Sequence, residues 1–123
     1  MSNTERYIYH FTERETFEQA KPRGGYTPRP FAQYGFIHGS TREQVLHVAN
    51  FIAPKDADLV LLEIDTDKVT PTIVYENLEG GEKLFPHIYG PLDLHAISKV
   101  WKFAPVNGEF VFPTDADMVD ATS

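Results

Sequence analysis

Histidines precede a predicted helix start at two places in the sequence. His10 lies two residues before Thr12–Glu15 and His38 lies two residues before Ser40–Glu43, and both segments have the pattern of a capping box. A helix N-terminus carries unpaired N–H groups and about half a positive charge, which attract anions. A histidine there can hydrogen-bond a phosphate, a carboxylate or a ribose hydroxyl, and the positive field lowers its pKa. The pattern predicts that His10 and His38 contact a ligand.

For either histidine alone there is a simpler interpretation. Capping boxes are common, and a histidine beside one can serve only to hydrogen-bond a backbone carbonyl. Gly39 favours a functional role for its neighbour His38, because a glycine lets a ligand or another backbone approach closely.

A third histidine lies between two prolines and a glycine. The segment Phe85–Pro91 predicts a rigid, irregular loop that holds His87 and Tyr89, and rigid loops often carry binding residues. Tyr89 would stack on a flat ligand such as a base or a nicotinamide ring. The alternative is a structural turn in which Phe85 and Ile88 enter the core.

Two glutamates are expected to be buried at strand ends. Glu63 and Glu76 each follow an apolar run, and a buried carboxylate needs a partner. A site histidine or a ligand hydroxyl would supply one. For Glu76, an ion pair at a loop edge is the alternative.

The elements that position these residues follow from apolar periodicity and caps. Each capping box starts a helix, and in the second helix Val45, Val48, Ala49 and Ile52 form one apolar stripe. Tight turns are expected at Asp93–Ile97 and at Asn107–Gly108, the second of which closes a hairpin. We expect an α+β fold, a small split or mixed β-sheet with two principal helices in the first half of the chain. Its strands are predicted at Tyr7–Phe11, Phe36–His38, Leu59–Asp65, Ile73–Asn77, Lys99–Phe103 and Glu109–Phe112, with loops at Gly24–Pro30 and Glu79–Glu82.

Length and composition limit the function classes. A chain of 123 residues is expected to form one globular domain over 1–112, followed by a flexible acidic tail over 113–123. There are no cysteines, which removes disulfides and thiolate chemistry. The formal charge of −7 disfavours non-specific nucleic-acid binding. No apolar run is long enough to span a bilayer, so we expect no membrane association and a cytoplasmic protein.

Four motifs together resemble a known family. They are Tyr9–Thr12, Gly35–Ser40 with Gln44, Tyr75–Glu76 and Phe85–Leu92. These strings are similar to those of domain-of-unknown-function family 952, and the similarity extends over about Tyr7 to Phe112. Members of that family are small bacterial proteins for which no reaction is established.

The resemblance implies a fold like that of the ADP-ribosyltransferase superfamily, with a nicotinamide–ribose cleft in a split sheet. His10 matches the position that contacts the adenosine ribose, and Gly35–Ser40 lies where phosphate or ribose would be cradled. The late catalytic glutamate of such enzymes has only Glu109 as a counterpart, and its neighbours depart from the motif.

Three hypotheses follow. The first is an enzyme, with a transferase as the candidate class. It would act on NAD or ADP-ribose-type compounds as cofactor or substrate. The second is a non-catalytic module that binds a nucleotide or small anion. The third, a metal site of the three histidines, lacks the usual short ligand spacing, and we expect no metal. The predicted catalytic residues are His10, His87 and Glu76, and the predicted ligand-binding residues are His38, Gly39, Ser40, Gln44 and Tyr89.

Overall fold

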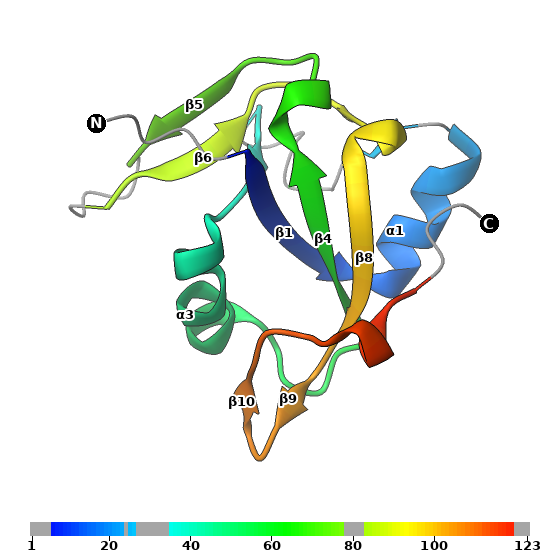
Figure 1. The fold of residues 1–123 in the computed structure, drawn as a ribbon, viewed down its shortest axis with the longest axis vertical. Helices are drawn as coiled ribbons and strands as arrows, with labels where there is room; N and C mark the ends of the chain where they lie inside the picture. Colours follow the sequence, from blue (N-terminus) through cyan, green and yellow to red (C-terminus); the bar gives the residue numbers. More distant parts are fainter. Residues whose placement is uncertain (1–5, 24, 27–34, 78–82, 120–123) are drawn as a thin grey trace.

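A computed structural model describes residues 6–23, 25–26, 35–77 and 83–119, and the chain has the expected α+β fold (Figure 1). Its main sheet has three antiparallel strands in the order β1–β4–β8. These strands are β1 (Tyr7–Glu13), β4 (Leu59–Asp65) and β8 (Ile97–Phe103). The two described α-helices, α1 (Arg14–Ala20) and α3 (Arg42–Ile52), both lie in the first half of the chain, as predicted.

A second antiparallel sheet has the order β3–β6–β5. Its strands are β3 (Ile37–His38), β6 (Phe85–Ile88) and β5 (Ile73–Glu76), so β6 is central. Two further pairs are β2 (Gly25–Tyr26) with β7 (Leu92–Asp93), and β9 (Pro105–Val106) with β10 (Glu109–Phe110). Short 3₁₀ turns occupy η1 (Lys21–Arg23), η2 (Thr66–Lys68), η3 (Leu94–Ala96) and η4 (Asp115–Asp117).

Both faces of the main sheet are buried, and every residue of β4 is buried. Because successive side chains of a strand point to opposite faces, Ile8 and Tyr9 of β1 enter different apolar clusters. The cluster with Ile8 also holds Phe17 of α1, and the cluster with Tyr9 holds Val45 of α3. The two helices therefore pack against different faces of the sheet.

Among the described residues, backbone hydrogen bonds between Tyr9 and Ser40 join the two sheets. Tyr9 N donates to Ser40 O at 2.7 Å, and Ser40 N donates to Tyr9 O at 2.8 Å. Ser40 follows β3 and precedes α3. The edge of β1 is thereby fixed to the start of α3 and to the second sheet.

The first predicted capping box is wrong. Thr12 and Glu13 continue β1 and pair with Val60 and Leu59, and Glu13 precedes α1 without a side-chain cap. Strand pairing outweighs the local capping signal there. The second box is displaced by one residue: its cap is Thr41, whose N–H donates to Oε1 of Gln44 at 3.0 Å.

Two other predictions need correction. Phe85–Ile88 is not an irregular loop but the central strand β6. Prolines are rare inside central strands, so the presence of Pro86 argued against a strand in the sequence. The predicted stripe of α3 faces the core only in part, because Val45 is buried whereas the side chain of Ile52 is 62% exposed.

Several local predictions are confirmed. The strand Leu59–Asp65 has its predicted bounds. The hairpin turn at Asn107 and Gly108 has φ values of 53° and 85°, and a 3₁₀ turn lies within the predicted Asp93–Ile97. The predicted loop Glu79–Glu82 lies outside the described residues, as does most of Gly24–Pro30.

The segment predicted as a flexible tail is partly in contact with the sheet. Residues 115–117 form η4, Met118 forms a bridge with Trp101 of β8, and Val119 N donates to Val100 O at 2.8 Å. Residues 120–123 lie outside the described residues. In the described part of the chain, no helix is long and apolar enough to cross a membrane.

Gly39 follows β3 and leaves no room for a side chain beside β6, so its replacement is a test of the fold. A Cβ on Gly39 would lie 2.9 Å from Pro86 O, the same carbonyl that accepts from Gly39 N at 2.9 Å. We predict that Gly39→Ala lowers the free energy of unfolding by about 1–3 kcal/mol in urea denaturation, because backbone must move to admit the methyl group. Gly25→Ala is the control, since its Cβ would meet Leu92 O at 3.6 Å. Equal stability of the two variants would contradict this account.

Candidate functional site

A groove of about 480 Å³ lies where β1, α3 and the second sheet meet. In Figure 1 the β5–β6 pair lies on one side of this region and α3 on the other. His10, His38 and His87 all line the groove, so the three predicted histidines share one site. The lining residues are Tyr9, His10, Phe11, His38, Gly39, Ser40, His47, Val48, Phe51, Ile52, Glu76, Asn77, Phe85 and His87.

The register of the second sheet brings the polar side chains together. His38 of β3 pairs with His87 of β6, and Val74 of β5 pairs with His87 from the other side. Side chains two residues apart share a face, so Glu76 is the diagonal neighbour of His87 on that face. Phe36 and Tyr89 share it by the same rule.

Glu76 accepts two hydrogen bonds from this face. His87 Nδ1 donates to Glu76 Oε2 at 2.9 Å, and the Tyr89 hydroxyl donates to the same oxygen. The bonds from Tyr89 and His87 hold the pKa of Glu76 below its usual value, and the bond to Glu76 raises the pKa of Tyr89. The carboxylate is therefore ionised at neutral pH.

Aromatic rings fix the plane of the His87 imidazole. Phe36 stacks on it with ring centroids 4.2 Å apart and an interplanar angle of 20°. His38 meets the same imidazole edge-on at 5.2 Å. Because His87 is only 4% exposed, its imidazole has little freedom to rotate.

These contacts determine the chemistry available to His87. A neutral imidazole carries one proton, and an ionised carboxylate accepts but does not donate. The bond to Glu76 therefore places that proton on Nδ1 of His87 and the lone pair on Nε2. An imidazole oriented in this way can accept a proton, and the neighbouring carboxylate stabilises the imidazolium that forms.

His10 is held in the neutral form. Its Nδ1 donates to His38 O at 2.6 Å, and burial lowers its pKa to about 4. The lowered pKa agrees with the sequence prediction, but its main cause is burial. The backbone bond is the simpler role foreseen for His10, and it coexists with a place in the groove wall.

The predicted phosphate cradle at Gly39 and Ser40 uses its amides internally. Gly39 N donates to Pro86 O, Ser40 N donates to Tyr9 O, and Thr41 N donates to the Gln44 side chain. The other end of Gln44, Nε2, donates to Leu84 O at 2.7 Å. Gly39 and Ser40 line the groove, whereas Gln44 and Tyr89 are not among its lining residues.

The wall formed by α3 was missed in the sequence. The groove is lined by His47, Val48, Phe51 and Ile52, and none of them is among the site residues predicted from the sequence. The available signal was the spacing of Val48, Phe51 and Ile52 at i, i+3 and i+4, which marks an apolar face. Because an apolar helix face is usually assigned to the core, this spacing did not predict a wall of the groove.

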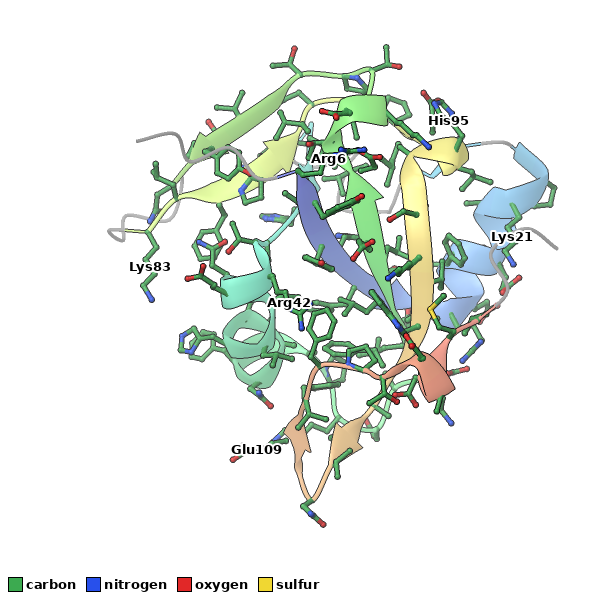
Figure 2. All side chains as sticks on the ribbon, in the orientation of Figure 1. Arg6, Lys21, Arg42, Lys83, His95 and Glu109 are labelled. Carbon is green, nitrogen blue, oxygen red and sulfur yellow. The ribbon has the colours of Figure 1, made fainter. Side chains whose placement is uncertain are left out.

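Other candidates lie away from the groove. Glu63 is buried on the main sheet, where it accepts from Tyr9 at 2.9 Å and from Ser98 at 2.7 Å. Its burial confirms the prediction, and its partners are protein side chains. His95 and Glu109 are exposed, lie at separate ends of the molecule (Figure 2) and do not line the groove. Within the described ranges, no three potential ligand side chains are grouped as a metal site.

The environment of His10 predicts an unusual titration. We expect its imidazole signals to titrate in NMR with a midpoint of about 4, because burial disfavours the imidazolium. In the unfolded chain a histidine has a pKa of about 6.5, so this group contributes stability at neutral pH that is lost as pH falls from about 6.5 towards 4. A midpoint near 6.5 for His10 would refute its burial.

Residues 11–100 match the family described as "Protein of unknown function (DUF952)". No curated protein matches the chain. The chain is similar to the crystal structure of protein CC0527 from Caulobacter crescentus, at 27% identity and a TM-score of 0.75, over 85% of this chain and 93% of that chain. The solution NMR structure of CC0527 gives 26% identity and a TM-score of 0.74, over 86% and 91%. The chain therefore belongs to the DUF952 family, as its motifs predicted.

Proposed function

We propose that the groove is an acid–base site for one small ligand, with His87 as the group that accepts and returns a proton. The observation that carries this proposal is the hydrogen bond from His87 Nδ1 to Glu76. The imidazole of His87 is buried and stacks on Phe36. Oriented imidazoles of this kind contribute roughly 10²–10⁴-fold to a proton transfer.

The residues around His87 take separate roles in this proposal. Glu76 is a positioning residue, because both His87 and Tyr89 occupy its carboxylate. His38 and His10 supply polar contacts to the ligand from the facing strands. We therefore assign proton transfer to His87 alone among the predicted catalytic residues.

A nucleotide or phosphorylated ribose, including NAD, is the ligand class that the family resemblance implies. The volume of about 480 Å³ lies within the usual range for small-molecule sites, roughly 300–1,000 Å³. ADP-ribosyl transfer from NAD would need a carboxylate beside the ribose to stabilise an oxocarbenium-like centre. Among the described lining residues Glu76 is the only carboxylate, and its internal bonds weigh against that specific reaction.

A non-catalytic binding module is the second candidate. The observation that favours it is that Glu76, Gly39 N and Ser40 N are all engaged within the protein. A site whose polar groups are already paired can recognise a ligand by shape without transforming it.

The test combines binding with turnover. Purified protein is titrated calorimetrically with NAD, ADP-ribose, nucleotides and nucleosides, and each mixture is incubated and analysed by mass spectrometry. We predict at least one binder, and a product whose rate of formation falls about 10²-fold or more in His87→Asn. In Glu76→Gln we also expect a loss of product formation, together with a displaced pH–rate profile, because an amide does not hold the proton on Nδ1 as a carboxylate does.

His95→Gln is the control, since His95 is exposed and outside the groove. Product formation that is unchanged in His87→Asn would refute the acid–base role. Binding without any product would support the binding module instead. If no compound binds at millimolar concentrations, both candidates fail for this ligand class.

A further inference from the structure

We infer that the ligand of this groove is an electrically neutral small molecule with an apolar part that lies against α3 and a polar part that reaches His87. This inference rests on the proposed function, because it names the substrate class of the same site. Three features of the groove lead to it: an apolar wall, the distribution of charge and the use of the backbone amides.

The apolar wall is the exposed face of α3. Phe51 is 83% exposed and Ile52 is 62% exposed, yet both line the groove together with the half-buried Val48. Val45 and Ala49, on another side of the same helix, are fully buried. Large apolar side chains gathered at a concave site favour an apolar occupant, because its binding removes their surface from water.

The charge of the groove disfavours an anion. No Lys or Arg is found among the lining residues in the part of the chain that the structure describes. His10 is neutral at physiological pH because burial lowers its pKa to about 4, while Glu76 carries a negative charge. A phosphate placed in the groove would approach a carboxylate without meeting an arginine or lysine in that lining.

The first arginines of α1 and α3 have contacts elsewhere in the protein. Arg14 pairs with Asp58 at 3.1 Å, and the Arg42 guanidinium lies 3.8 Å from the ring centroid of Phe112. The exposed Lys83 (Figure 2) lies two residues before β6 and is not a lining residue. Its backbone carbonyl accepts from the Asn77 side chain. Lys83 is therefore the cation to control for in a test with anions.

Three backbone amides of the expected anion cradle are used within the protein. They are the N–H groups of Gly39, Ser40 and Thr41, which lead from β3 to the first residue of α3. All three donate within the protein. A neutral ligand needs none of them, and a polar group on it can pair with the histidine wall.

Matched probes test the inference. Adenosine and AMP share a base and a ribose and differ by a phosphate, and nicotinamide and nicotinate share a ring and differ by a charge. Binding of each probe is followed by NMR chemical shifts of Phe51, His38 and His87. We predict that the neutral member of each pair binds at least about tenfold more tightly than the anion, and that Phe51→Ala with Ile52→Ala weakens the neutral probe by a similar factor.

Val106→Ala is the control variant, because Val106 is 54% exposed on the β9–β10 hairpin and lies outside the groove. Tighter binding of AMP or nicotinate would overturn the inference, and loss of that preference in Lys83→Ala would identify the cation responsible. The absence of binding by both neutral probes would also overturn it. If neutral probes bind at Phe51 while His87→Asn leaves all turnover unchanged, the ligand class stands and the acid–base proposal fails.

Discussion

The register of β6 between β3 and β5 is the constraint on which the candidate site depends. It pairs His87 with His38 on one side and with Val74 on the other, and so places Glu76 diagonally beside the imidazole. A shift of one residue would turn His87 to the opposite face of the sheet. The hydrogen bond from Gly39 N to Pro86 O continues this pairing beyond β3, and a side chain at Gly39 would collide with the same carbonyl.

The rest of the fold supports this small sheet and completes the groove. The fully buried strand β4 pairs with β1, and the hydrogen bonds between Tyr9 and Ser40 fix the start of α3 to β1. α3 buries Val45 on the main sheet and leaves Phe51 exposed at the groove. One wall is thus polar and hydrogen-bonded internally, and the other is apolar. We propose that this contrast selects a neutral, amphipathic ligand.

Sequence patterns predicted the strong local signals and missed those set by long-range pairing. The apolar run Leu59–Asp65 identified a buried strand, and the three histidines proved to share one groove. Thr12 has the pattern of a helix cap, but it pairs with Val60 and belongs to β1. The central strand β6 was not predicted, because it contains Pro86. The amides of Gly39 and Ser40 in the expected anion cradle donate to Pro86 O and Tyr9 O, and these acceptors come from distant strands that no local motif reveals.

The tautomer of His87 tests the central claim most directly. Long-range ¹H–¹⁵N spectra of the imidazole, recorded at a pH where histidines are neutral, distinguish the two tautomers. We predict that His87 carries its proton on Nδ1, because Nδ1 donates to the Glu76 carboxylate, and that Glu76→Leu abolishes this preference. A proton on Nε2 of His87 in the unaltered protein would contradict the oriented acid–base pair and the function proposed from it.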